Sequence, residues 1–104
     1  MTTKKFNLGQ LFMTESIQHI TDVKNDFLKF CANSVERHLS GDWGDLEEED
    51  KESNNEALEN RGRLLSSYNL PDEYKSIHYA NDEKIWIITE WDRSYTTILL
   101  PTEY

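Results

Sequence analysis

The chain has 104 residues, with 20 acidic and 11 basic side chains and a formal net charge of −9. This length predicts one domain, residues 1–104, whose core needs neither disulfide nor metal. No run of 18 apolar residues and no secretory signal is present, so we expect a cytoplasmic protein that neither spans nor binds a membrane. The negative charge repels phosphate, which argues against direct binding of nucleic acid and favours a basic partner.

Familiar catalytic and metal-binding motifs are missing from the sequence. Cys31 is the single cysteine, which excludes an intramolecular disulfide and a cysteine-based zinc site. His19, His38 and His78 are isolated in the sequence, and the acidic residues lack the spacing of a calcium loop. No P-loop, Gly-x-Gly-x-x-Gly or Gly-x-Ser-x-Gly pattern occurs. We therefore expect no cofactor, no metal and no catalytic residue of these classes.

In chain order, the first expected element is a strand over residues 5–13, with an irregularity at Gly9. A short helix whose first turn is capped by the Thr14 hydroxyl follows. Apolar residues then recur every three or four positions over residues 23–39, which predicts one amphipathic helix. Its apolar face consists of Val23, Phe27, Leu28, Cys31, Val35 and Leu39.

The second half begins with residues 47–60, which are polar nearly all round but rich in helix-forming Glu and Lys. We expect a helix there, docked only by Leu46, Ala57 and Leu58.

Strand patterns follow over residues 63–68, 84–90 and 95–100, and loops are expected at 69–72 and 81–82. Residues 84–90 carry the strongest β signal and are predicted to be central, with residues 95–100 as their hairpin partner. Together these elements predict an α+β fold. It has about four strands in a largely antiparallel sheet, with two or three helices on one face.

Nearly all of the charge imbalance lies in 18 consecutive residues, 42–59, which hold nine carboxylates and one lysine. The nine are Asp42, Asp45, Glu47, Glu48, Glu49, Asp50, Glu52, Glu56 and Glu59. On a helix, this density approaches the phosphate spacing of a nucleic-acid strand, so a basic groove built for phosphates would attract it. Acidic runs are also typical of solvated surfaces that confer solubility.

Apolar side chains accompany the acidic run. Trp43 and Leu46 lie within it, and Trp91 follows the predicted central strand. Large apolar side chains of this kind anchor partners at interfaces, although Trp43 also fits a core position.

Two polar groups suggest a different kind of site. Arg37 and His38 close the predicted long helix just before Asp42, where the helix dipole favours a charged histidine. Glu90 and Asp92 lie two residues apart beside Arg93, a spacing that suits an acid–base pair. Capping by Arg37 and His38, and a turn fixed by Asp92 and Arg93, explain the same residues structurally.

Three segments carry a resemblance to a known family. Residues 37–46 (RHLSGDWGDL), 63–68 (RLLSSY) and 84–104 (KIWIITEWDRSYTTILLPTEY) resemble a family of small bacterial, phage and plasmid proteins. Its members are labelled "plasmid-related protein" or "type I restriction endonuclease subunit M". A methylation subunit needs a methyl-donor fold and an Asn-Pro-Pro motif, neither of which this short chain has. The resemblance thus implies a mobile-element protein; Trp91 departs from the small residue typical of relatives.

These observations lead to two functional hypotheses. The first is an acidic inhibitor of a host defence system, anti-CRISPR or anti-restriction, whose residues 42–59 and Trp91 cover the basic surface of a nuclease by charge mimicry. The second is a small enzyme or ligand-binding domain with a polar site formed by Arg37, His38, Asp42, Glu90, Asp92 and Arg93. An interaction module with another partner is a third reading.

Overall fold

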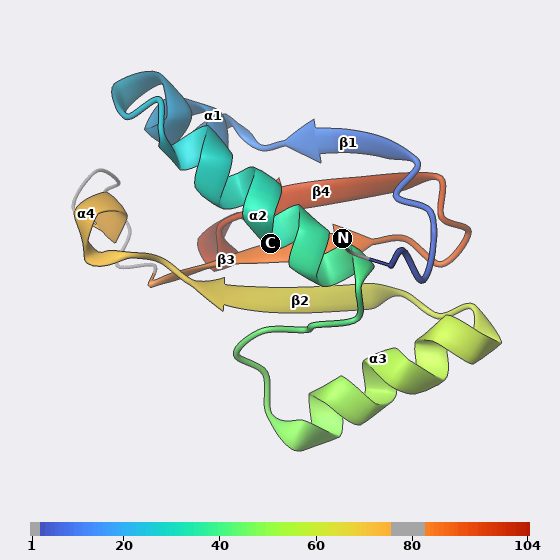
Figure 1. Ribbon diagram of the computed structural model, residues 1–104. Coiled ribbons are helices and arrows are strands. Elements are labelled where there is room, and N and C mark those ends of the chain that lie inside the picture. The colour runs from blue at the N-terminus through green and yellow to red at the C-terminus, as the bar shows by residue number, and fades with distance from the viewer. Residues whose placement is uncertain (1–2, 76–82) are drawn as a thin grey trace.

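The computed structural model describes residues 3–75 and 83–104, and it confirms an α+β fold built on a four-stranded sheet (Figure 1). The strands are β1 (Gln10–Met13), β2 (Leu64–Asn69), β3 (Lys84–Thr89) and β4 (Tyr95–Leu99), in the order β1-β4-β3-β2. β3 pairs antiparallel with both β2 and β4, whereas β1 pairs parallel with β4. The sheet is therefore largely antiparallel, and β3 is central as predicted.

Two helices cover one face of this sheet. The helices are α1 (Glu15–Val23), α2 (Phe27–Leu39), α3 (Glu48–Asn60) and α4 (Asp72–Lys75), with a final 3-10 turn, η1 (Pro101–Glu103). α2 crosses the front of the sheet in Figure 1, and α1 joins it in the same core. α3 lies instead along the outer edge of β2 (Figure 1). No helix in the described ranges is long and apolar enough to cross a bilayer.

The core lies between α1, α2 and one face of the sheet. Strand side chains alternate between the two faces, so β3 directs Ile85 and Ile87 toward the helices and Trp86 toward the opposite side. The buried apolar residues of this core are Ile17, Ile20, Phe27, Cys31, Val35, Leu39, Tyr68, Leu70, Tyr74, Ile85, Ile87, Ile98 and Leu100. On the opposite face, the ring of Tyr104 packs 5.8 Å from that of Trp86.

The helix predicted over residues 23–39 begins at Phe27 rather than at Val23, because the chain turns between α1 and α2. Val23 ends α1 and Phe27 begins α2, and the intervening Asn25 and Asp26 are residues that favour turns and helix starts. Val23, at the end of α1, is 56% exposed, and Leu28, within α2, is 50% exposed, so neither belongs to the buried apolar face. The apolar spacing runs on across the turn, and for that reason periodicity alone placed the start of the second helix four residues too early.

The predicted first strand is shorter than its pattern, because only residues 10–13 pair with β4. Gly9 adopts φ +67°, and a Cβ there would lie 2.2 Å from the Ser94 carbonyl oxygen. This close approach requires glycine at position 9, and the strand begins at the next residue, Gln10. Phe6 and Leu8 precede the strand and pack, half-buried, against the core.

Thr14 precedes α1 as predicted, but its hydroxyl does not cap the helix backbone. It donates instead to the Glu103 carboxylate at 2.7 Å, and the same carboxylate accepts the Ser16 amide at 3.3 Å. The C-terminal turn thus supplies the anion at the start of α1, where the helix dipole favours negative charge.

The loop predicted at 69–72 lies between β2 and α4, and the loop predicted at 81–82 lies outside the described residues.

Candidate partner-binding surface

Residues 43–45 form a short extension of the sheet along the outer edge of β2. The Ser67 amide donates to the Trp43 carbonyl at 3.2 Å, and the Asp45 amide donates to the Ser67 carbonyl at 2.6 Å. Gly44 bridges Ser67 with φ +77°, where a Cβ would lie 2.0 Å from the Ser67 carbonyl oxygen. Gly44, the second glycine of the segment Gly-Asp-Trp-Gly, is therefore required for backbone contact with β2.

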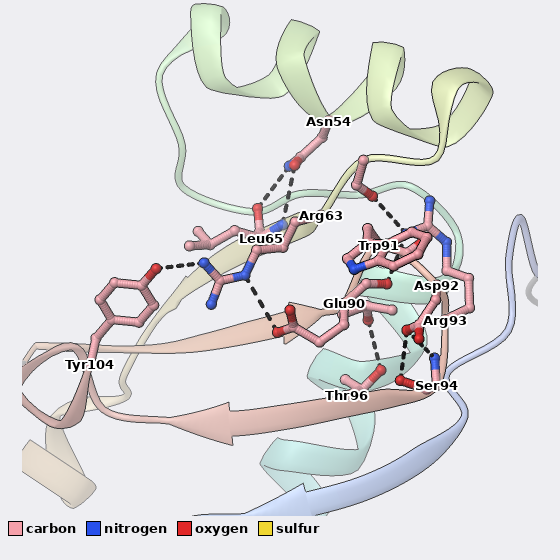
Figure 2. A network of polar contacts seen from close by, with 12 residues as sticks. Asn54, Arg63, Leu65, Glu90, Trp91, Asp92, Arg93, Ser94, Thr96 and Tyr104 are labelled. Atoms are coloured by element: carbon pink, nitrogen blue, oxygen red, sulfur yellow. Dashed lines mark hydrogen bonds and ion pairs between the residues drawn. The ribbon is translucent and has the colours of Figure 1, made fainter.

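Asn54 continues this edge from α3. Its side-chain amide donates to the Leu65 carbonyl at 2.7 Å, and its side-chain carbonyl accepts the Leu65 amide at 3.1 Å (Figure 2). One asparagine thereby replaces the hydrogen bonds that a neighbouring strand would make to this residue. The buried Asn54 thus fixes the distance and orientation of α3 relative to the sheet.

A second asparagine and a buried tryptophan complete the docking of α3. The Trp43 indole N–H donates to the Asn55 side-chain carbonyl at 2.9 Å, and Trp43 is only 3% exposed. Leu46, Ala57 and Leu58, the docking residues predicted from the sequence, are half-buried. Sequence reasoning missed Asn54 and Asn55, whose two consecutive amides within an otherwise acidic helix were the available signal.

Arg93 holds the C-terminal end of α3. Its guanidinium donates to the carbonyl of Gly62 at 2.6 Å and to that of Ala57 at 3.1 Å. Because α3 has no basic residue in its last turn, this arginine from the β3–β4 turn supplies the positive charge that a helix C-terminus favours. Acidic residues Glu48, Glu49 and Asp50 complement the opposite end.

The outer side of α3 carries a continuous row of carboxylates, which we call the acidic face and which consists of Glu48, Glu49, Glu52, Glu56 and Glu59. At about 3.6 residues per turn, these positions share one side of the helix, opposite the buried Asn54. All five side chains are exposed. One of them, Glu48, pairs with Lys51 at 3.7 Å.

The charge density of the acidic face is comparable with that of a nucleic-acid strand. Glu48 and Glu59 are separated by about 16 Å of helix at about 1.5 Å per residue. Five carboxylates over that length lie about 4 Å apart along the axis, whereas phosphates of one DNA strand are about 3.4 Å apart. The two structures are therefore similar in the spacing of negative charges along the axis.

The other four carboxylates of the acidic run point elsewhere. Asp42 pairs with Arg37 at 2.7 Å, which lowers the pKa of the carboxyl group. Asp45 accepts the Asn69 amide at 3.0 Å and so belongs to the β2 edge. Glu47 and Asp50 line a cavity beside α3, described below. The structure therefore separates these residues from the five that form one surface.

Of the three predicted apolar anchors, only Trp91 is on the surface. It is 62% exposed at the β3–β4 turn, and Arg93 links this turn to the last residues of α3. In Figure 2, Trp91 lies on the same turn as Arg93, whose guanidinium reaches the Ala57 carbonyl of α3. Leu46 is half-buried, and Trp43 is buried in the packing of α3.

His38 is a buried residue of the core. Its Nδ1 lies 2.5 Å from the Ser66 hydroxyl and its Nε2 lies 2.9 Å from the Thr89 hydroxyl. Burial, and secondarily the charge of Arg93, lowers its pKa to about 3. The imidazole is therefore neutral near pH 7 and holds α2 to β2 and β3 rather than carrying a proton at a surface.

The remaining residues of the alternative polar site lie in separate interactions. Glu90 follows Thr89 and therefore points away from His38, toward Arg63, which it pairs with at 3.4 Å. The Asp92 carboxylate accepts the Ser94 amide and hydroxyl at 3.0 Å and 2.6 Å, which lowers its pKa and fixes the turn. Among the described residues, the charge of Arg93 lowers the pKa of His38, but neither His38 nor Asp42 makes a hydrogen bond or ion pair with residues of this turn.

The described residues form neither a cluster of metal ligands nor an activated thiol. Within residues 3–75 and 83–104, no three His, Cys, Asp or Glu side chains are grouped to hold a metal ion. Cys31 is buried, which raises its pKa to about 12 and keeps it a protonated thiol.

Comparison with protein-family models, with curated proteins and with solved structures gives no match to this chain. The family resemblance noted above therefore stays a prediction. What this chain does must be inferred from its own surfaces.

Proposed function

We propose that the protein is a small acidic inhibitor of a host defence system that targets nucleic acid, an anti-CRISPR or anti-restriction protein. It acts in the cytoplasm, where its acidic face occupies the basic surface on which a nuclease holds DNA or RNA. The observation that carries this proposal is the set of five exposed glutamates on one side of α3. The resemblance to plasmid and phage proteins is consistent with such a role.

Charge and apolar contact play different parts in the proposed complex. The acidic face accelerates encounter with a basic groove, because opposite potentials steer association. Trp91, exposed beside the end of α3, supplies the buried aromatic contact that slows dissociation. The docking of α3 by Asn54 and Arg93 keeps the helix that carries the glutamates in a fixed position, so no backbone segment has to become ordered on binding.

The test is DNA cleavage by candidate nucleases, an RNA-guided nuclease and a type I restriction enzyme, with and without the protein. We expect inhibition by the native chain and at least tenfold weaker inhibition by the triple variant E48Q/E52Q/E56Q. Raising the salt to about 0.5 M shortens the screening length to roughly 4 Å and should weaken inhibition similarly. A gel shift with DNA alone should show no complex.

A matched control removes the same charge from other surfaces. The variant E15Q/E36Q/E73Q changes three exposed glutamates on α1, α2 and α4 and should inhibit like the native chain. Both variants should unfold within about 1 kcal/mol of the native chain, because exposed positions contribute little to stability and each variant removes charge from the first turn of a helix. Equal inhibition by the two variants, or no inhibition of either nuclease class, would refute charge mimicry.

A further inference from the structure

A cavity of about 450 Å³ opens between the first half of α3 and the face of the sheet that α2 leaves uncovered. Its volume falls within the range of about 300–1,000 Å³ typical of small-ligand sites. Among the described residues, three carboxylates, of Asp45, Glu47 and Asp50, line it together with one ammonium group, that of Lys84. The cavity is thus negatively charged and adjoins, but does not include, the acidic face.

Ser67 supplies an independent sign of a ligand. Its side chain lies in the lining of this cavity and is only 1% exposed, yet its hydroxyl has no hydrogen-bond partner among the described residues. Buried hydroxyl groups are normally paired, because leaving them unpaired costs free energy. The neighbouring Ser66, on the other face of β2, pairs with His38. The Ser67 hydroxyl is therefore a buried polar group in the wall of this cavity, unpaired in the part of the chain that the structure describes.

The walls favour a flat cation with an aliphatic stem. Trp86 lies directly opposite Ser67 in the β2–β3 register, so its indole and the serine hydroxyl are neighbours on one face. An indole face attracts cations, and guanidinium groups stack on it more readily than ammonium groups. Leu46 and Leu65 provide apolar surface on which methylene groups pack.

We propose that this cavity binds an arginine side chain of a protein partner. The guanidinium stacks against Trp86 and donates to the Ser67 hydroxyl and the Asp50 carboxylate, while its methylene stem contacts Leu46 and Leu65. The identity of the partner rests on the proposed function, since a surface that holds phosphates is rich in arginine. The cation-binding property itself depends only on the cavity.

The test is a nuclear magnetic resonance titration of the full chain with Nα-acetyl-arginine amide. Nα-acetyl-citrulline amide is the control, because its urea group has the shape of guanidinium without the charge. We expect saturable shifts at the Trp86 indole N–H and the Ser67 amide, with about fivefold weaker binding of the citrulline compound. Equal binding of the two compounds, or shifts spread over other surfaces, would overturn the proposal.

Two variants locate the site. S67A should fold normally, because the hydroxyl makes no bond within the described chain, and should weaken arginine-amide binding about threefold or more. D50N should weaken it by a similar factor. Unchanged binding by both would show that arginine associates elsewhere and would reject the site.

The triple variant of the acidic face separates this inference from the proposed function. E48Q/E52Q/E56Q should bind the arginine amide like the native chain while losing inhibition. Native inhibition by this variant with intact arginine binding would reject charge mimicry and leave the cavity site standing. Loss of both properties in the variant would place arginine on the acidic face and reject the cavity.

Discussion

α2 and α3 are both 13 residues long but are attached to the sheet in opposite ways. α2 buries six residues, most of them apolar, on the face of the sheet. α3 buries one, Asn54, and is attached along the β2 edge through hydrogen bonds to the backbone. One helix is therefore held by the hydrophobic effect and the other by directed polar contacts.

The difference shows how a small domain displays a charged surface without weakening its core. A helix on a sheet face must give a wide stripe of its surface to apolar packing. A helix docked at an edge by Asn54, Asn55 and an arginine from outside keeps most of its circumference free. In this protein that free circumference carries the acidic face.

The largest effect should come from α2. Phe27→Ala removes a fully buried ring that packs against Phe30 and Tyr74, and we expect a loss of about 3–5 kcal/mol from the free energy of unfolding. Urea denaturation measures it. Leu28→Ala, at the exposed neighbouring position, should cost below about 1 kcal/mol. Equal losses at the two positions would mean that α2 does not present this face to the core.

His38 makes the α2 attachment sensitive to pH. Its folded-state pKa of about 3 lies below the unfolded value of about 6.5, so below pH 6.5 the unfolded chain binds a proton that the folded chain does not. Its contribution to stability is complete above pH 6.5 and falls by about 1.4 kcal/mol per pH unit between pH 6.5 and 3.

Denaturation of His38→Gln across this range checks the effect. The variant should be less stable at pH 7 but should lose the histidine part of the pH slope. His19→Gln, on the exposed side of α1, should keep it. A slope unchanged in His38→Gln would show that His38 is protonated in the folded state.

Sequence patterns predicted the helices and strands that depend on apolar burial, and they missed the contacts that depend on hydrogen bonds between distant residues. The strands at residues 64–69, 84–89 and 95–99 and the helical state of residues 48–60 follow from composition and period. The edge contacts of Asn54 join residues with no apolar signal, and periodicity does not register a hydrogen bond to a distant backbone. The same holds for the candidate surfaces. Charge density predicted the acidic run, and the helical period groups five of its glutamates, but only the fold shows that this side of α3 faces away from the sheet.

Asn54 is the residue that best separates the two modes of attachment. Asn54→Ala leaves the amide and carbonyl of Leu65 unpaired at the edge of β2, and we expect a loss of about 1–3 kcal/mol from the free energy of unfolding. The loss stays below that of Phe27→Ala because water reaches a sheet edge more readily than a core. Asn33→Ala, which changes an exposed asparagine on α2, should alter stability by at most about 0.5 kcal/mol.

The location of the change in Asn54→Ala is as informative as its size. If α3 is attached by these bonds, amide hydrogen exchange should accelerate along residues 48–60 and at Leu65 while the amides of α2 stay protected. Inhibition of a nuclease should then weaken although every glutamate is retained, because a detached helix no longer holds its carboxylates in one orientation. Uniform acceleration across both helices would instead make α3 part of the same cooperative core as α2, and the contrast between the two helices would disappear.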